Sequence, residues 1–434
     1  MLLVAAAVFA AAVFAAAPAL AEPSAAANHE QLAAALASRV VSANPSITAM
    51  RARITALEQR VRRASAWPDP QVAVEYSNMP IDAWRPGTHP MAGIQFKLQQ
   101  TFPFPGKVGL RQEVGRGRVR ETRAALDELA LQLRALVKRA YYKLVLVRQL
   151  RSVTEQHVKL VDQFTDVVRI KYQVGKAGQQ DYLRLQVLAQ KLRDDLKNFE
   201  RDERALAATI DAALHRARTP IVTPSSLAAA AAPKATAAKL AELASAHRPA
   251  LRQQTEVSRT RRLAARSAAR EGYPDFTAWL GYRLRFASTD SGTDFIGVGV
   301  SVPIPFWYKR RAGSERHASE ALARAALADR SSALDRIRGA LGRELAAWRR
   351  AHQKARTYEQ TLMPLAHKAL DATFASYQVD RTDFAALYQA ELQLLEFERV
   401  IRRARLTTWI ARVNVEALVG KALRKAPPGL GRQP

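Results

Sequence analysis

The feature that most constrains this chain is an internal repeat with a period of about 205 residues. Three pairs of short segments recur in the same order: Trp67-Pro68-Asp69 with Tyr273-Pro274-Asp275, Pro103-Phe104-Pro105 with Pro303-Ile304-Pro305, and Tyr172-Gln173-Val174-Gly175 with Tyr377-Gln378-Val379-Asp380. Ordered matches of this kind indicate two copies of one structural unit. We therefore expect residues 22–217 and 238–422 to share a fold, joined by a Pro/Ala/Ser-rich linker at 218–237.

Each copy contains two segments in which apolar and polar residues alternate. The alternation predicts strands at 71–77 and 92–101 in the first copy, and at 275–286 and 294–303 in the second. Alternating segments of about ten residues are typical of transmembrane β-strands, with lipid on one side and water on the other. They are equally typical of an ordinary half-buried sheet, so the pattern alone leaves both readings open.

Long helices follow the strands in both copies. The spacing of apolar residues by threes and fours predicts helices at 108–172 and 178–216, and again at 309–376 and 383–420. A helix of about 65 residues is a rod of roughly 100 Å, because each residue adds 1.5 Å. The narrow apolar stripe, on which His157 is expected to be a packed histidine, predicts coiled-coil packing. The fold class is therefore mainly α with a small β part, built from a duplicated helix-strand-strand-long helix-helix unit.

The N-terminal segment indicates export. Residues 1–21 are uncharged and apolar, and they end in the small-x-small pattern Ala19-Leu20-Ala21, which predicts a cleaved signal peptide. A retained membrane anchor is the alternative. The chain has no cysteine, which excludes an acylated N-terminal cysteine and thiolate metal ligands. Residues 423–434 are expected to form a disordered tail.

Four strands per chain set a condition on any membrane-spanning structure. A bilayer does not tolerate an open sheet edge, so four strands could span it only if several chains associate. Two chains would give eight strands and a filled interior, whereas three would give twelve strands and room for a pore. A trimer follows once a transport pore is assumed.

The order of these features resembles the TolC-like outer-membrane efflux family over about residues 30 to 420. The resemblance is carried by the duplicated element order, the Pro-Asp pair before each first strand and the segment Thr101-Phe102-Pro103-Phe104-Pro105-Gly106-Lys107 after the second. It implies a homotrimer, with a twelve-stranded β-barrel among outer-membrane lipid, continued by a twelve-helix α-barrel across the periplasm. It also implies two partners, a periplasmic adaptor (membrane-fusion) protein and an inner-membrane pump of the resistance-nodulation-division (RND) type.

The resemblance also implies that two helix-hairpin tips form the periplasmic entrance and bind the adaptor. The implied tip residues are Tyr172, Val174, Gly175, Lys176, Gly178, Asp181, Tyr377, Val379, Asp380, Arg381 and Asp383. The implied strand-exit turns contain Pro103, Pro105, Gly106, Pro303 and Pro305. The second tip departs from the family pattern, because Asp380 replaces the usual glycine and Ala386 stands where an acidic residue is common. This departure puts in doubt whether both tips bind the adaptor in the same way.

The predicted function is that of a passive exit duct for small toxic compounds or metal ions, and the strand exit at 102–107 resembles the metal-efflux branch of the family. We expect no enzymatic activity, because the chain lacks nucleophile-elbow, phosphate-loop and dinucleotide motifs. We also expect no catalytic residues, no cofactor and no resident metal, since the eight histidines are scattered. Met79, His89 and Met91 lie between the first two strands and are of types that can contact a soft cation, but we expect a solvent loop there.

The charge of the chain leaves further alternatives to consider. Lys and Arg number 67 against 39 acidic residues, for a net charge of +28. A basic protein can bind nucleic acid, but here the basic residues are mixed with acidic ones along helices without a recognised reader motif, so we expect no nucleic-acid partner. Two other functions stay open: a type I protein-secretion duct, and an exported coiled-coil envelope protein without a pore.

Overall fold

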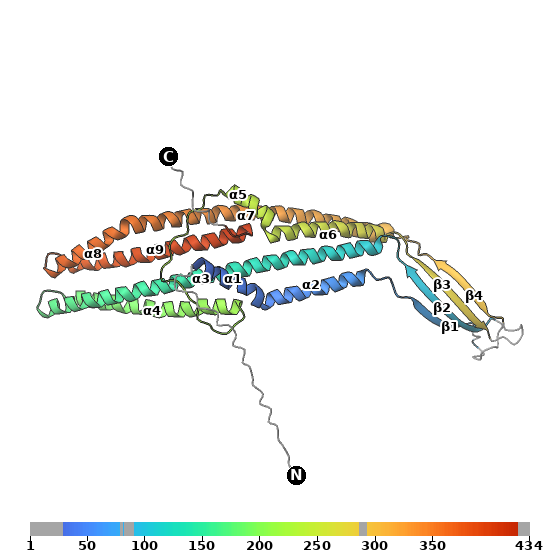
Figure 1. Cartoon of the computed structure of the whole chain (residues 1–434), viewed down its shortest axis with the longest axis horizontal. Helices are drawn as coiled ribbons and strands as arrows, with labels where there is room; N and C mark the ends of the chain where they lie inside the picture. The colour runs from blue at the N-terminus through green and yellow to red at the C-terminus, as the bar shows by residue number, and fades with distance from the viewer. Residues whose placement is uncertain (1–28, 79–80, 82–90, 286–292, 424–434) are drawn as a thin grey trace, which may run out of the picture.

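The computed structural model describes residues 29–78, 81, 91–285 and 293–423, and it shows a long molecule with a sheet at one end and two helical hairpins at the other (Figure 1). The predicted signal peptide at 1–21 and residues 424–434 of the predicted tail lie outside the described residues. So do Met79 and His89. The two ends of the molecule are therefore structurally different, and long helices connect them.

The chain contains the same element order twice. The first copy comprises α1 (His29–Ala43), α2 (Pro45–Ala64), β1 (Gln71–Ser77), β2 (Gly93–Phe102), α3 (Lys107–Gln173) and α4 (Gln179–Ala213). The second comprises α5 (Ala237–His247), α6 (Pro249–Glu271), β3 (Phe276–Arg285), β4 (Phe295–Ser301), η1 (Lys309–Gly313), α7 (Ser314–Thr357), η2 (Tyr358–Leu362), α8 (Met363–Gln378) and α9 (Phe384–Val419). The predicted fold class, mainly α with a small β part in a duplicated order, is confirmed.

The helix predicted at 309–376 is not one uniform α-helix. Two π-helical segments, η1 and η2, divide the helical path, and Pro364 is the second residue of α8, which begins where η2 ends. Proline has no backbone N–H and its ring crowds the preceding turn, so a regular hydrogen-bond ladder cannot run through it. Its counterpart in the first copy, α3, contains no proline and continues as α-helix for 67 residues.

The four strands form one antiparallel sheet in the order β1-β2-β3-β4. Its central pair runs from Gly93 opposite Arg285 to Phe102 opposite Phe276. One face of the sheet is apolar, and its side chains are exposed in the single chain. These side chains are Val72, Val74, Phe96, Leu98, Leu280, Tyr282, Ile296, Val298 and Val300. The opposite face carries polar side chains, and the outer edges of β1 and β4 have no strand partner within the described residues.

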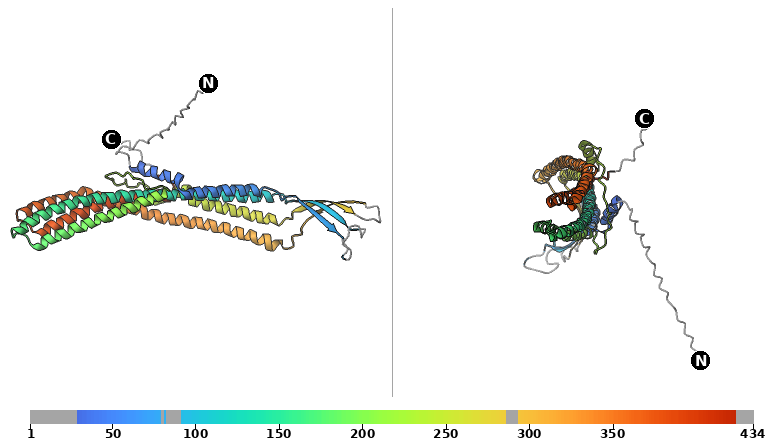
Figure 2. Two further views of the ribbon diagram at one scale, coloured as in Figure 1. Left: turned by 90° about the horizontal axis from the view of Figure 1, so that it is seen from below. Right: turned by 90° about the vertical axis from the view of Figure 1, so that its left-hand side faces the viewer.

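Two hydrophobic clusters hold the helices together. One lies near the middle of the molecule and includes linker residues such as Ile221 and Leu227. The linker is tied to α9 by hydrogen bonds, since the Thr408 hydroxyl accepts from the Ala230 N–H at 2.8 Å and the Trp409 indole donates to the Ala228 carbonyl at 2.8 Å. The other cluster fills the space between the two hairpins towards their tips. Seen end-on, the helices form a curved layer (Figure 2).

Within the described part of the chain, no helix combines the length and the apolar character that a membrane-spanning helix needs.

Candidate functional site

The sequence-predicted tip residues lie in the two hairpin turns at the end of the molecule remote from the sheet (Figure 1). The first turn joins α3 to α4, and the second joins α8 to α9. Both helices before the turns end in the same way: the Lys176 N–H donates to the Lys171 carbonyl at 2.7 Å, and the Arg381 N–H donates to the Ser376 carbonyl at 2.9 Å. This six-residue closure, with one left-handed residue inside it, is the Schellman ending. The two tips therefore share one backbone geometry.

Gly175 and Asp380 occupy the same left-handed position in their turns. Gly175 has φ +73° and Asp380 has φ +60°. Glycine adopts this region without strain, and aspartate does so more readily than most residues with a Cβ. The replacement of glycine in the second tip therefore leaves the shape of the turn intact. What it adds is a carboxylate at the point where the hairpins meet.

That carboxylate joins the second hairpin to the first. Asp380 forms ion pairs with Lys171 at the end of α3 and with Lys176 in the first turn, the second at 2.9 Å between Lys176 Nζ and Asp380 Oδ2. The hydrogen bonds from the two lysines hold the pKa of the Asp380 carboxyl below its usual value. Lys171 also donates to the Tyr377 carbonyl at 2.6 Å. Sequence analysis missed Lys171, although a basic residue in the last turn of a helix is a common sequence signal.

Tyr377 is buried beside this contact. The Lys171 ammonium lies 4.6 Å from the centroid of the Tyr377 ring. Burial, with the negative charges of Asp181 and Asp380 nearby, raises the pKa of the Tyr377 hydroxyl. Tyr377, one of the tip residues predicted from the sequence, therefore packs between the two hairpins and is not exposed at their surface.

Apolar side chains are exposed around both turns. Val174 is 64% exposed and Val379 is 62% exposed, with Tyr172 and Leu183 nearby in sequence also exposed. Gly178 and Asp383 are the N-cap residues of α4 and α9, and the Asp383 carboxylate accepts from the Ala386 N–H at 2.9 Å. Asp383 thus stabilises the start of α9, because its carboxylate satisfies a backbone N–H of the first helical turn. Apolar groups exposed around a rigid turn are typical of an interaction surface.

A second contact between the hairpins lies deeper in the bundle. His157 of α3 is buried, as predicted, and its Nδ1 lies 2.5 Å from Glu391 Oε1 of α9. Nearby, Arg399 of α9 donates to Asp195 of α4 at 2.9 Å. The buried Glu391 was not among the residues predicted from the sequence, because its partner lies on a different helix.

The strand-exit turns connect the sheet to the helices. Gly106 has φ +88° and stands directly before α3. The Asp275 carboxylate accepts two hydrogen bonds at 2.8 Å, one from the Phe104 N–H and one from the buried Lys107 ammonium. The first exit turn, with Pro103 and Pro105, is thus held against the entry to β3. Pro303 and Pro305 occupy the corresponding exposed turn after β4.

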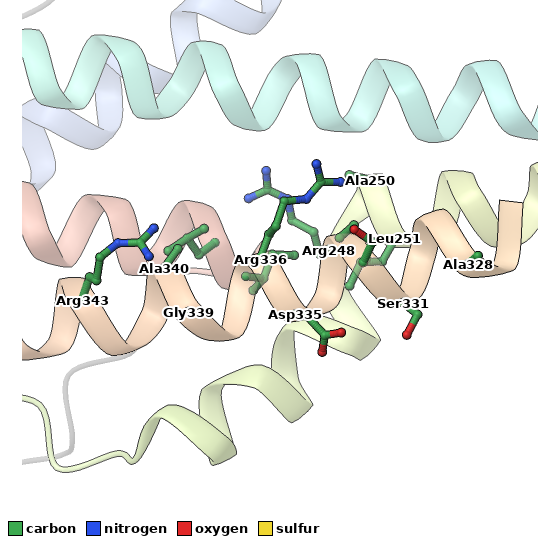
Figure 3. A pocket seen from close by; sticks show the side chains of 14 residues that line it. Arg248, Ala250, Leu251, Ala328, Ser331, Asp335, Arg336, Gly339, Ala340 and Arg343 are labelled. Carbon is green, nitrogen blue, oxygen red and sulfur yellow. The ribbon is translucent and has the colours of Figure 1, made fainter. Parts of the chain in front are cut away.

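A recess of the surface lies elsewhere, beside the middle of α7 and the start of α6 (Figure 3). It is an open groove lined by small residues and by arginines that include Arg336 and Arg343. Arg248 at its edge is paired with Glu128 at 2.6 Å and fixes the start of α6 to α3. Among the described residues, no group of three or more His, Asp or Glu side chains is arranged to hold a metal ion.

Comparison with known proteins agrees with this arrangement. Residues 36–215 match the model of a family described as outer membrane efflux protein. No curated protein sequence matches the chain. One solved structure with this fold is that of CusC, a protein that forms a transmembrane channel. It superposes with a TM-score of 0.76 at 12% sequence identity, and the match covers 90% of this chain and 92% of the CusC chain.

Two further solved structures share the fold. VceC, an outer membrane protein from Vibrio cholerae, has a TM-score of 0.73 at 15% identity, with 91% of this chain and 97% of VceC covered. The CmeC outer membrane channel from Campylobacter jejuni has a TM-score of 0.74 at 10% identity, with 90% and 86% covered. The resemblance to TolC-like outer-membrane efflux proteins that the sequence predicted is confirmed.

Proposed function

Since residues 36–215 match the outer membrane efflux protein family and the fold is that of solved outer-membrane channels, we propose that three copies form the exit duct of a tripartite efflux system. The sheets would join into a twelve-stranded barrel in the outer membrane, and the helices would continue it as a tube across the periplasm. Transport through such a duct is passive, and an inner-membrane RND-type pump would supply the energy. The proposed cargo is small toxic compounds or metal ions, and the proposed route to the membrane is export by the N-terminal signal peptide.

One observation supports this proposal above all others: the sheet has two unlike faces and two open edges. Its apolar face carries exposed valine, leucine and phenylalanine side chains, which suits contact with lipid. Its polar face suits a water-filled interior. Strand edges that lack partners are not stable in a bilayer, and they become paired when several copies close a barrel. A pore-less coiled-coil envelope protein gives no reason for such a sheet.

We further propose that the paired hairpin tips bind a periplasmic adaptor protein. The support is the exposed Val174 and Val379 beside two rigid turns of equal geometry. The equal geometry supports binding by both tips, because the second tip presents the same backbone shape as the first although Asp380 replaces glycine there. A type I secretion duct would use the same tips, and a gene for an ABC exporter beside this one would favour that alternative.

The duct is tested with the purified full-length chain in planar bilayers. We expect stable conductance steps, a requirement for detergent during purification, and a protein mass of three chains by light scattering with the detergent contribution subtracted. A protein that is soluble without detergent and gives no conductance would contradict the proposal and favour the envelope protein without a pore.

The tip is tested by adding bulk without disturbing its fold. A Cβ at Gly178 would meet its nearest neighbour, Gln180 Cγ, at 3.5 Å, an ordinary contact, so side chains fit there. We expect Gly178→Trp to abolish complementation of a deletion strain while the trimer still assembles, and Gly178→Ala to retain efflux as the matched control. Gly175→Pro acts differently, since it changes the turn itself; it should also abolish efflux, because proline cannot adopt the φ of +73°. Full complementation by Gly178→Trp would show that the tip assignment is wrong.

A further inference from the structure

The polar face of the sheet carries its charged side chains in neighbouring rows of cross-strand partners. In one row, Glu75 lies opposite Gln95, which lies opposite Arg283. In the next row, Lys97 lies between Ala73 on β1 and Gly281 on β3, and Gly281 lies opposite Gly297 on β4. Arg285, opposite Gly93, lies in the row on the other side of the first row. The row of Glu75 and Arg283 contains one charge of each sign, and the row of Lys97 contains a single positive charge.

Lys97 is the one residue with a long side chain in its row of described partners. Its partners in the row are alanine and two glycines, so no other side chain there extends beyond a methyl group. Among the described residues Lys97 forms no ion pair, and its ammonium lies 5.0 Å from the centroid of the Trp279 ring, within the range of a cation–π interaction. The charge of Lys97 is thus held in place without being neutralised.

The Trp279 ring lies next to three glycines of the sheet. A Cβ added to Gly299 would come within 2.6 Å of the indole, and one added to Gly297 or Gly281 would come within 3.3 or 3.4 Å. A Cβ at Gly299 would overlap the ring, one at Gly297 would crowd it, and one at Gly281 would be in ordinary contact with it, so the glycines leave room for the large ring along the sheet. The glycines therefore explain how a tryptophan fits on the polar face, and the tryptophan supports the lysine ammonium.

We propose that Lys97 and Trp279 form a positively charged collar inside the sheet section of the duct, which favours small anionic compounds that carry carboxylate or phosphate groups. This inference rests on the proposed duct, because three copies are needed to place three Lys97 ammonium groups at one level of the pore. Rings of lysine or arginine attract anions and repel cations. Within the proposed cargo, the collar selects against free metal cations. Its sign agrees with the net charge of +28.

The experiment measures the chloride-to-potassium permeability ratio of the purified full-length protein in planar bilayers under a potassium chloride gradient. We expect a ratio above one at about 0.1 M salt, where charges act over about 10 Å, and a ratio nearer one at about 1 M, where they act over about 3 Å. Lys97→Gln should lower the ratio, and Lys97→Glu should bring it below one. Trp279→Ala should lower it by less than Lys97→Gln, because the charge stays but loses its support.

The matched control is Lys239→Glu, which makes the same change of charge at an exposed residue of α5, far from the sheet (Figure 1). It should keep the wild-type ratio. A conducting wild type that prefers potassium, or a Lys97→Glu variant with the ratio of the control, would overturn the collar and leave the duct standing. Absence of conductance in every protein would overturn the duct itself.

Discussion

At the scale of single residues, Asp380 shows how a substitution changes a contact without changing a fold. A left-handed backbone costs an ordinary residue about 1–2 kcal/mol, which is why glycine is common at this position. Aspartate tolerates it better, and the contacts of Asp380 with Lys171 and Lys176 favour the conformation further. The second tip therefore keeps its turn and gains an ionic connection to the first.

This connection predicts a pH-dependent separation of the tips. The pKa of Asp380 is lowered by the hydrogen bonds from the two lysines, so the carboxylate is ionised at neutral pH and the contact is present. Its stabilising effect is lost as the pH falls through this lowered pKa. Because the chain has no cysteine, Val174→Cys and Val379→Cys offer unique sites for spin labels. We expect the label-to-label distance distribution to be narrow at neutral pH and broad in strong acid.

The control for this measurement is Asp380→Asn in the same labelled chain, mixed with unlabelled protein so that each assembly holds one labelled copy. The amide tolerates the left-handed backbone but cannot form the ion pairs, so its distribution should be broad at every pH. Equal distributions for the two proteins at neutral pH would show that the ion pairs do not hold the tips together.

At the scale of elements, two of the glycines in α3, Gly115 and Gly117, mark close approaches between helices. Gly109, Gly115 and Gly117 are expected to weaken a helix, yet α3 runs through all three. A Cβ on Gly117 would lie 2.3 Å from the Thr260 hydroxyl oxygen of α6. The absence of a side chain there lets the first copy pack against the second, and this gain outweighs the cost of glycine in a helix.

We therefore predict opposite outcomes for two glycine substitutions in this helix. Gly117→Val should lower the free energy of unfolding by about 1–3 kcal/mol, because the added side chain overfills the contact with Thr260. Gly109→Ala should leave stability unchanged or raise it by up to about 1 kcal/mol, since nothing lies within 4 Å of its added Cβ. Thermal unfolding followed by circular dichroism checks both, and equal melting temperatures would contradict the close packing of α3 on α6.

At the scale of the whole molecule, the two faces of the sheet predict different tolerance for charge. Val74 lies on the apolar face and Ala73, its neighbour in β1, on the polar face. In a membrane barrel, Val74→Arg should destabilise assembly by about 2–4 kcal/mol per chain. Ala73→Glu should assemble normally, because its charge faces Lys97 on the polar face and has the opposite sign. The amount of heat-resistant trimer on gels measures this difference. Equal assembly of the two variants would indicate that the sheet does not contact lipid.

Much of this architecture follows from local patterns. Period-two alternation identified the strands and assigned Phe96 and Leu98 to one face and Lys97 to the other, because side chains alternate along any extended chain. Spacing by threes and fours identified the helices and the seam on which His157 lies. The predicted tip residues gather at one end because both copies of the repeat place a turn there. The partners of those residues, such as Lys171 with Asp380, did not follow from the pattern.

The sequence by itself determined the duplication, the order of helices and strands, and the two unlike faces of the sheet, since each of these depends on residues close together along the chain. Only the tertiary structure decided that Asp380 binds lysines about 205 residues away, that Glu391 is buried beside His157, and that Trp279 lies over three glycines. Those contacts join residues from different copies or different strands. Their geometry depends on how whole elements pack, which periodicity along one segment does not encode.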